Sequence, residues 1–442
     1  MHLASYLGVA RTTWYSHADP IAIPLKSQDD VKDEQTKVSL LDLSKQVTPP
    51  CRLNPLIFNG HVQTCWTAIK GLDIPITYKR RIFISNSTTY PGTFAVDFVG
   101  PTPETAPEPD VSLPQRTTYY TEDEFKLMGS DDDKPMLIML HGLSGGSHEI
   151  YLRHVLRPLC LEDGGWEACV VNARGCAQSK ITSGVLYNAR ATWDVRQMVD
   201  WCREKWPRRK LFGIGFSLGG NILTNYLGEE GAKCKLDAAV IVSNPWNLEV
   251  SNLALQRSWI GLHVYARVMG TGMKQLFEDH FEQITKGNPD IDIEKVRSAR
   301  YLHEFDRYVQ CPTWGWPTEG AYYRDASSVE PLLAIRIPVL AIHAEDDPIA
   351  VNEAVPHEEI KQSRHVVLCS TSLGGHLSWF EIGGERWFSR SACAFLQKMA
   401  NEADLEALKK QREIPEPETT TSHKKPVVYD PIRRKLLIPD VA

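Results

Sequence analysis

The chain has 442 residues, of which 42% are hydrophobic, so it is long enough to build a large core. Its formal net charge of -6 gives no electrostatic reason to expect a nucleic acid as a partner. The ten cysteines are scattered, without a Cys-x-x-Cys pair or a Cys/His cluster at zinc spacing. This pattern predicts reduced thiols, and it gives no sign of a metal or another cofactor.

The sequence also carries no signal for export or for membrane insertion. Its first 17 residues lack a basic start followed by a long apolar core, and no later run approaches the length of a membrane span. We therefore expect an intracellular, cytoplasmic protein that is not secreted.

The N-terminal part contains no chemistry that the sequence alone identifies. Residues 1–54 show no sustained period, and we expect an extension that packs on the outside of the core. Residues 55–67 indicate a turn that opens a short helix, in which His61 is expected to be structural. Residues 80–85 and 93–99 alternate like paired strands. The first candidates for function follow these strands.

A buried strand then leads into a glycine-rich loop. Residues 136–140 are a continuous apolar run, which is typical of a strand buried on both faces, and segment 141–147 reads His-Gly-Leu-Ser-Gly-Gly-Ser. Glycines let backbone N–H groups approach a ligand closely, so the N–H of Leu143 is a candidate donor to an oxyanion. An ordinary tight turn is the alternative interpretation.

Helix and strand patterns alternate after this loop, which predicts a parallel sheet. Helical spacing runs over residues 149–161 and 192–205, and residues 168–172 form another apolar strand. Cys176 follows that strand, but no histidine is paired with it in a recognisable way. We therefore expect Cys176 to be a structural cysteine.

Residues 210–221 predict a strand, a sharp turn and a helix around a Gly-x-Ser-x-Gly motif formed by Gly215, Ser217 and Gly219. The turn holds the serine in a strained conformation in which neighbouring Cβ atoms would clash, so both glycines are needed. Ser217 is the candidate nucleophile. The N–H of Leu218, at the start of the helix, is the second candidate oxyanion donor.

The same glycines also resemble a loosened dinucleotide-binding fingerprint. That interpretation predicts an acidic residue at the end of the next strand, about twenty positions further on. The next strand, residues 238–242, ends in Ser-Asn-Pro instead, and the nearest acid, Asp237, lies before it. The sequence therefore favours a serine nucleophile over a nucleotide site.

Residues 245–325 interrupt the alternation with helical, aromatic-rich segments, and we interpret them as a lid. In a doubly wound sheet the ligand binds beyond the carboxyl ends of the strands, so an insertion there can cover the site. Its apolar residues are candidates for a substrate pocket, with the ordinary core of a helical subdomain as the alternative. The candidates are Trp259, Ile260, Leu262, Val264, Tyr265, Val268 and Met269.

Candidates for an acid and a base follow the lid. A buried strand over residues 337–343 ends in an acidic turn, whose pattern favours Asp347 over Asp346 as the carboxylate that accepts from a histidine. His376 lies on a glycine-flanked loop after the last strand. Ser217, Asp347 and His376 thus occur in the chain order that α/β-hydrolases have.

A final helix is expected over residues 389–410, and the Pro-, Thr- and Lys-rich tail is expected to be mobile or to lie on the surface. The predicted parts of the chain are an extension (1–54), a first core part (55–244), the lid (245–325), a second core part (326–411) and the tail (412–442).

Seven segments are distinctive in combination. They are His141-Gly-Leu-Ser-Gly-Gly-Ser-His148, Arg174-Gly-Cys-Ala-Gln-Ser-Lys180, the turn at Ser217, Asn225-Tyr-Leu-Gly-Glu-Glu-Gly231, Asn244-Pro-Trp246, Asp346-Asp-Pro348 and Gly374-Gly-His-Leu377. Together, over residues 55–398, the chain closely resembles the fungal medium-chain fatty acid ethyl ester synthase/esterases of the AB hydrolase 4 family. Several fungal members have Cys and Phe beside the serine, where this chain has Phe216 and Leu218, so the resemblance leaves the chain-length preference open.

The resemblance implies an α/β-hydrolase fold, with a mostly parallel central sheet, helices on both faces and a helical lid. It implies an esterase, monoacylglycerol lipase or alcohol O-acyltransferase for medium-chain acyl esters, with Ser217, Asp347 and His376 as the triad. The substrate would be an acyl ester, acyl-CoA or a monoacylglycerol, the acceptor water or an alcohol, and no cofactor is implied. Contact with a membrane or lipid droplet fits such substrates, although the sequence shows no anchor.

Two other functions stay open from the sequence. A non-catalytic scaffold or receptor with this fold would have lost a member of the triad, whereas all three members and both turn glycines are present. An esterase for non-lipid esters would keep the triad. The sequence does not separate it from a lipid esterase, because the pocket belongs to the lid.

Overall fold

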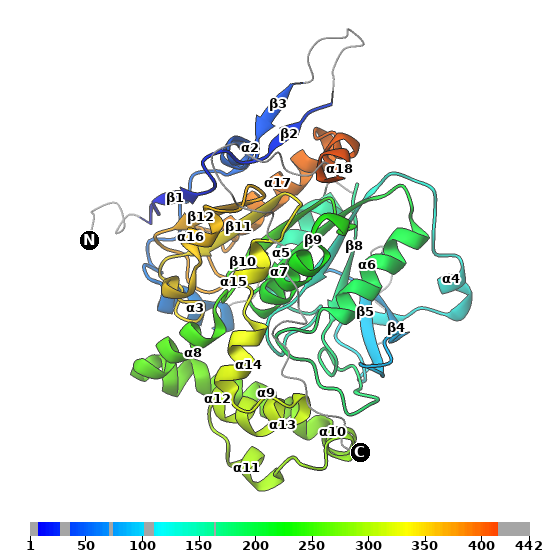
Figure 1. Cartoon of the computed structure of the whole chain (residues 1–442), viewed down its shortest axis with the longest axis vertical. Coiled ribbons are helices and arrows are strands. Elements are labelled where there is room, and N and C mark those ends of the chain that lie inside the picture. The colour runs from blue at the N-terminus through cyan, green and yellow to red at the C-terminus, as the bar shows by residue number, and fades with distance from the viewer. Residues whose placement is uncertain (1–7, 27–35, 70–73, 101–109, 163–164, 414–442) are drawn as a thin grey trace.

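The computed structural model describes residues 8–26, 36–69, 74–100, 110–162 and 165–413. The predicted tail therefore lies almost entirely outside the described residues. A ten-stranded sheet runs through the centre of the molecule (Figure 1). Its strands are, in spatial order, β1 (Thr12–Tyr15), β12 (Val366–Thr371), β11 (Val339–Ala344), β10 (Ala238–Val242), β9 (Lys210–Phe216), β7 (Pro135–Leu140), β8 (Glu167–Asn172), β5 (Thr93–Val99), β4 (Tyr78–Ile84) and β6 (Thr117–Tyr119).

The six adjoining strands from β12 to β8 are parallel, and the antiparallel pairs lie toward the two edges. At one edge β1 pairs antiparallel with β12, and at the other β8, β5 and β4 pair antiparallel in turn. The mostly parallel sheet confirms the predicted fold class. The chain leaves β7 for its neighbour β8 and returns to its other neighbour, β9, so the order reverses at β7. Ligands bind beyond the carboxyl ends of strands at such a point.

Helices cover both faces of the sheet, as predicted. One core contains side chains of α2 (Leu40–Val47), α5 (Ile150–Leu156) and α17 (Trp387–Asn401). The other contains side chains of α6 (Trp193–Lys205), α7 (Leu218–Glu230), α15 (Val329–Leu332) and α16 (His357–Ile360). Along β7, Leu137 and Met139 face the first core, whereas Met136, Ile138 and Leu140 face the second. This alternation explains why the strand is apolar throughout.

Two predicted helices are shorter than the sequence pattern indicated. The helix expected over 149–161 is α5 followed by a π-helical turn, Arg157–Glu162, in which Pro158 has no N–H to continue the α-helical ladder. The helix expected over 389–410 is interrupted, and a new helix, α18 (Leu405–Glu413), begins after it. Asp404 caps this helix by accepting from the N–H of Ala407 at 3.0 Å.

The N-terminal part of the chain contributes a strand to the central sheet as well as packing against the core. Strand β1 extends the central sheet, and β2 (Ala22–Pro24) pairs with β3 (Lys37–Ser39) in a separate two-stranded ladder. Helix α3 (Gly60–Ile69) follows and lies near the carboxyl end of the sheet (Figure 1). The sequence pattern did not indicate β1, because its four residues are all only half-buried at a sheet edge.

Between β10 and β11 the chain is helical, and we call residues 248–326 the cap. The cap lies beyond the carboxyl end of the sheet, at the bottom of Figure 1. Its helices are α8 (Leu248–Arg257), the π-helix η3 (Gly261–Ala266), α9 (Arg267–Asp279), α10 (Phe281–Gly287), α11 (Ile293–Ser298), α12 (Leu302–Phe305), the π-helix η4 (Asp306–Gln310), α13 (Cys311–Trp314) and α14 (Glu319–Ala326).

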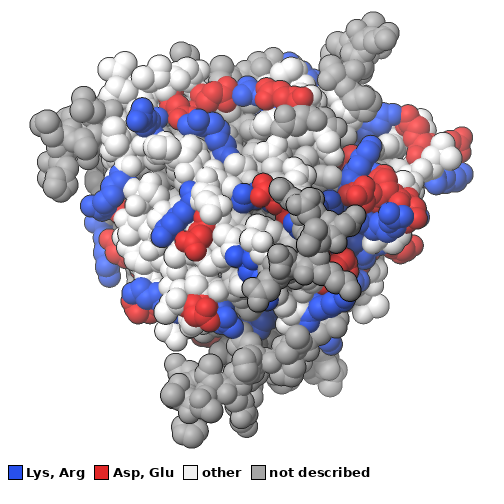
Figure 2. Space-filling model, turned by 90° about the horizontal axis from the view of Figure 1, so that it is seen from above, with Lys and Arg blue, Asp and Glu red and all other residues white. Residues whose placement is uncertain are grey.

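The surface carries both signs of charge. Figure 2 shows Lys and Arg side chains interspersed with Asp and Glu on the face seen from above, with no extended area of a single sign among the described atoms. None of the helices in the described ranges combines the length and hydropathy that crossing a bilayer requires.

Two adjacent arginines of β4 have opposite environments. The Arg80 side chain is fully buried and donates to both carboxylate oxygens of Asp97, at 2.6 and 2.7 Å. Asp97 also accepts from Ser147 Oγ at 2.5 Å, so this ion pair supports the glycine-rich loop. Arg81 lies on the other side of the strand and pairs with Glu122 at the surface.

We expect Asp97→Ala to lower the free energy of unfolding by about 3–5 kcal/mol, because it leaves the charge of Arg80 buried without a partner. Glu122→Ala is the matched control, since Arg81 stays hydrated and loses little. Denaturant unfolding of the two variants measures the difference. Equal, small losses of stability would contradict the importance of the buried pair.

Candidate active site

Ser217 occupies a strained turn between β9 and α7. Its φ of 52° and ψ of -121° are rarely adopted by a residue with a side chain. A Cβ atom at Gly215 would lie 2.5 Å from the carbonyl oxygen of Gly219, and one at Gly219 would lie 2.4 Å from that of Leu140. Both distances are too short for any side chain, so the two glycines are required, as the sequence motif predicted.

The structure brings Ser217, His376 and Asp347 together from the ends of three different strands. Ser217 Oγ lies 2.9 Å from His376 Nε2, and His376 Nδ1 lies 2.8 Å from one carboxylate oxygen of Asp347 and 3.1 Å from the other. A carboxylate only accepts hydrogen bonds, so the imidazole proton sits on Nδ1. Nε2 is then free to accept the proton of the Ser217 hydroxyl.

Asp347 is held as a buried carboxylate. Its side chain is fully buried, and its Oδ1 accepts from the N–H groups of Ile349 and Ala350, both at 2.9 Å. Burial by itself would raise the pKa of Asp347, but the charge and hydrogen bond of His376, with His343 and the N–H of Ile349, hold this pKa below its usual value. The group that faces His376 is therefore ionised.

Asp346, the alternative acid, faces another way. Its Oδ1 accepts from the N–H of Gly375 at 2.9 Å, so it fixes the loop that carries His376 without touching the imidazole. Burial, together with the neighbouring charge of Asp347, raises the pKa of Asp346 to about 6. The two adjacent acids thus have different partners, and the one that meets His376 is the one that the turn pattern favoured.

Helix α3 supports the histidine loop, which no sequence motif indicated. Thr64 Oγ1 accepts from the backbone N–H of His376 at 2.9 Å and donates to the carbonyl of Gly60 at 2.6 Å. His61, expected to be structural, has its Nδ1 2.9 Å from the hydroxyl of Tyr265 and so links α3 to the cap. The contacts of Thr64 with His376 and of His61 with Tyr265 join residues more than 200 positions apart, which local sequence patterns do not reveal.

The two candidate oxyanion donors, Leu143 and Leu218, line the same cavity as Ser217. Leu218 is the first residue of α7, so its N–H has no partner within the helix. Among the described residues, neither N–H donates to a protein acceptor. Both donors are therefore free to bind a negatively charged oxygen beside Ser217.

His141 fixes the loop that contains Leu143. Its Nε2 accepts from the N–H of Ala173 at 3.0 Å, so its Nδ1–H donates to the carbonyl of Gly142 at 2.7 Å. Burial lowers the pKa of His141 to about 4, which keeps the ring neutral and this pattern of donors unchanged near neutral pH. The hydroxyl of Tyr151 accepts from the N–H of Gly142 at 2.8 Å and so also fixes this loop.

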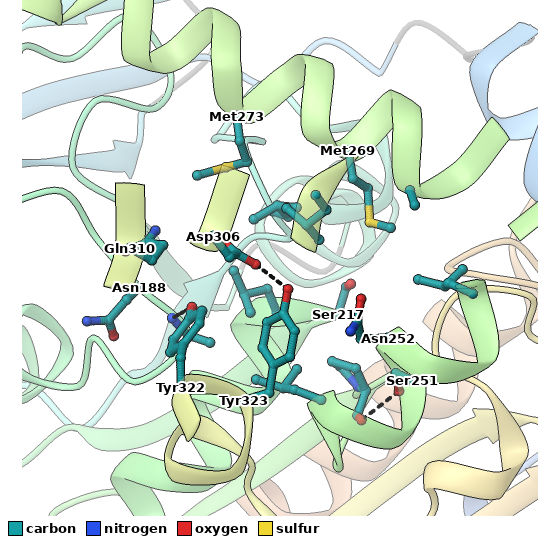
Figure 3. A pocket seen from close by; sticks show the side chains of 18 of the residues that line it. Asn188, Ser217, Ser251, Asn252, Met269, Met273, Asp306, Gln310, Tyr322 and Tyr323 are labelled. Carbon is teal, nitrogen blue, oxygen red and sulfur yellow. Dashed lines mark hydrogen bonds between the residues drawn. The ribbon is translucent and has the colours of Figure 1, made fainter. Parts of the chain in front are cut away.

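Ser217 lines a partly open cavity between the loop after β7 and the cap (Figure 3), with about 780 Å³ of empty space including the part open to solvent. Most of its wall is apolar. The apolar residues include Leu143, Leu218, Leu248, Leu255, Ala266, Met269, Met273 and Leu302.

Of the seven candidate pocket residues, Met269 is the one that lines the cavity. Trp259 and Val268 are 72% and 66% exposed. Ala266, Met269 and Met273 lie on one face of the helical run from η3 into α9, at intervals of three and four residues, and that face meets the cavity. Val268, which lies between them, is on another face of this helical run and is exposed.

The structure gives no support to a catalytic role for Cys176. Cys176 is 3% exposed, and burial raises the pKa of its thiol to about 12, as suits a structural cysteine. In the part of the chain that the structure describes, no group of three or more His, Cys, Asp or Glu side chains is arranged to hold a metal ion.

We expect Gly219→Ala to abolish any ester hydrolysis at Ser217 and to destabilise the fold, because its new methyl group would collide with the backbone at the end of β7. Gly220→Ala is the matched control in the next position of α7, where the nearest atom would be 3.3 Å away. Thermal unfolding and turnover of p-nitrophenyl octanoate measure the two effects. Similar behaviour of the two variants would show that the close approach at Gly219 is not needed.

Comparisons with known proteins agree with this geometry. A family model described as the alpha/beta hydrolase fold matches residues 135–381. A monoacylglycerol lipase of Saccharomyces cerevisiae is 36% identical over 429 residues, which cover 90% of this chain and 93% of that protein. The medium-chain fatty acid ethyl ester synthase/esterase 2 of the same yeast is 28% identical, covering 83% and 91%.

Among solved structures, an esterase of Pyrococcus furiosus is 15% identical, with a TM-score of 0.41 and coverage of 74% of this chain and 92% of that one. The family model covers more than half of the chain, and the yeast lipase is similar over nearly its whole length. The chain therefore belongs to the α/β-hydrolase family.

Proposed function

We propose that this protein is a serine esterase that hydrolyses medium-chain acyl esters and also transfers their acyl groups to alcohols. The observation that carries the proposal is the continuous hydrogen-bonded chain from Asp347 through His376 to Ser217, which opens into a largely apolar cavity. The names of the two yeast relatives support the substrate class, since one is a monoacylglycerol lipase and the other an ethyl ester synthase/esterase.

In the proposed first half-reaction, His376 Nε2 takes the proton of the Ser217 hydroxyl while Ser217 Oγ forms a bond to the ester or thioester carbonyl carbon. The N–H groups of Leu143 and Leu218 donate to the oxyanion that develops. The imidazolium, stabilised by Asp347, then gives its proton to the departing alcohol or thiol, which leaves the acyl group on Ser217.

In the second half-reaction the acceptor enters from the cavity. His376 takes a proton from water or an alcohol, whose oxygen attacks the acyl carbon, and Ser217 leaves with that proton. Water gives a free acid, whereas ethanol or glycerol gives a new ester. Hydrolysis and transfer therefore use the same serine, and the balance between them depends on which acceptor reaches the acyl-enzyme.

We expect Ser217→Ala to lower kcat for p-nitrophenyl octanoate by about 10⁴-fold or more, because no covalent intermediate forms. A fluorophosphonate probe should label the natural protein and not the variant. Thermal unfolding of the variant confirms that it is folded. Residual turnover near the natural rate would refute the acyl-enzyme, and absence of labelling in the natural protein would favour a non-catalytic receptor.

The products identify the substrate and the acceptor. Octanoyl-CoA with ethanol, monooctanoylglycerol with water, and a non-lipid aryl ester of a short acid are offered separately to the natural protein. Ethyl octanoate formed in the first reaction supports transfer, and octanoate formed in the second supports a lipase. Turnover of the aryl ester alone would show that the substrate is not a lipid.

We further expect Asp347→Asn to lower kcat by about 10⁴-fold, because an amide no longer stabilises the imidazolium or fixes its proton on Nδ1. Asp346→Asn is the matched control: its amide oxygen can still accept from the N–H of Gly375, so kcat should fall by less than about tenfold. Steady-state kinetics with p-nitrophenyl octanoate compare the two. The reverse order of effects would exchange the roles of the acids.

A further inference from the structure

The cavity that contains Ser217 has a polar wall as well as an apolar one. Asp306 and Gln310 from η4 and Tyr323 from α14 line it together with the methionines of α9. Figure 3 shows Asp306 joined to Tyr323, with Gln310 on the side of this pair away from Ser217 in that view. An acyl chain offers no hydrogen bonds to these groups.

Asp306 is a buried carboxyl without a positive partner among the described contacts. It is 5% exposed, and its Oδ2 accepts from the hydroxyl of Tyr323 at 2.6 Å. Burial raises the pKa of Asp306 to about 7, against the lowering effect of Tyr323 and with a further increase from Glu319. Near neutral pH a large fraction of this group is therefore uncharged, and an uncharged carboxyl has an O–H to donate.

Gln310 adds an acceptor to the same wall. It is 2% exposed, and its amide nitrogen donates to the carbonyl of Tyr187 at 3.0 Å. Its amide oxygen has no hydrogen-bond partner among the residues that the structure describes. Buried polar atoms are usually paired, because an unpaired one loses its hydrogen bonds to water without replacement. The cavity wall thus includes both a donor and an unpaired acceptor, and a hydroxyl group can satisfy both.

The backbone brings these two residues to one face. Asp306 and Gln310 are the first and last residues of the π-helix η4, which interrupts the run from α12 to α13. Single π-helical turns inside helices are rare and are frequent at functional sites. The neighbouring Tyr322 also lines the cavity. Its hydroxyl accepts from the N–H of Ala189 at 2.9 Å, so it already has a partner within the fold.

We propose that Asp306, Gln310 and Tyr323 form a binding site for a hydroxyl-bearing part of the ester substrate. The glycerol of a monoacylglycerol is one source of such hydroxyls, and a hydroxylated acyl chain is the other. The proposal rests on the proposed function, because it assigns a substrate class to the cavity of Ser217. A site built to hydrogen-bond a hydroxyl discriminates strongly against a ligand that lacks it.

The test compares three esters of one chain length: monooctanoylglycerol, ethyl octanoate and ethyl 8-hydroxyoctanoate. In the double variant Asp306→Leu/Tyr323→Phe, both hydrogen-bonding partners become apolar groups of similar size, which limits the effect on folding. We expect kcat/KM for one hydroxylated ester to fall about tenfold relative to ethyl octanoate. Because each ratio comes from one preparation, it does not depend on the folded fraction.

The substrate whose ratio falls identifies the source of the hydroxyl group. A selective loss for monooctanoylglycerol assigns the site to glycerol, and a selective loss for the hydroxyoctanoate assigns it to the acyl chain. Tyr322→Phe is the matched control, whose effect should be equal for all three esters. An equal effect of the double variant on the three esters overturns the proposal, even though the esterase activity itself is present.

Binding separates this proposal from the proposed function. Calorimetry with the Ser217→Ala protein uses three ethers that cannot be cleaved: 1-O-octylglycerol, 1-ethoxyoctane and 8-ethoxyoctan-1-ol. A preference for one hydroxylated ether, lost when Asp306→Leu/Tyr323→Phe is added, supports the site even if no ester is hydrolysed. Equal affinity for the three ethers, with active natural enzyme, overturns the site and leaves the esterase intact.

Discussion

The active site depends on the contact between the turn after β9 and the end of β7. Gly219 lies so close to the carbonyl of Leu140 that no side chain fits between them. This contact places Ser217, the N–H of Leu218 and the loop with Leu143 at one point, because β7 and β9 are neighbours in the sheet. The strain at Ser217 is tolerated since two flanking strands and α7 fix both sides of the turn.

Asp347 and His376 approach Ser217 from strands that lie on the opposite side of β9 from β7. Asp347 follows β11 and His376 follows β12, so the carboxyl ends of parallel strands bring the three candidate triad side chains to one edge of the sheet. Partly buried hydrogen bonds then fix the loop of His376: Asp346 accepts from the N–H of Gly375, and Thr64 accepts from the N–H of His376. The cap adds the apolar cavity and, on η4, its polar wall.

The sequence predicted the parts of the molecule in which a local pattern has a single physical cause. Continuous apolar runs predicted the parallel strands, and the spacing of Gly215 and Gly219 predicted the turn at Ser217. It did not predict the support from Thr64, the edge strand β1 or the cavity face of α9, which depend on contacts between distant segments. The sequence also did not reveal the unpaired amide oxygen of Gln310, because the residue type does not show whether a glutamine is buried.

The hydrogen bond between Thr64 and the backbone of His376 also has a consequence for folding. It joins residues 312 positions apart, so nearly three quarters of the chain separates the helix that is synthesised early from the loop that is synthesised late. Contacts of such long range form after local ones, because closing a longer loop costs more entropy. The central strands can pair before this link exists, so we expect the loop that carries His376 to become fixed late in folding.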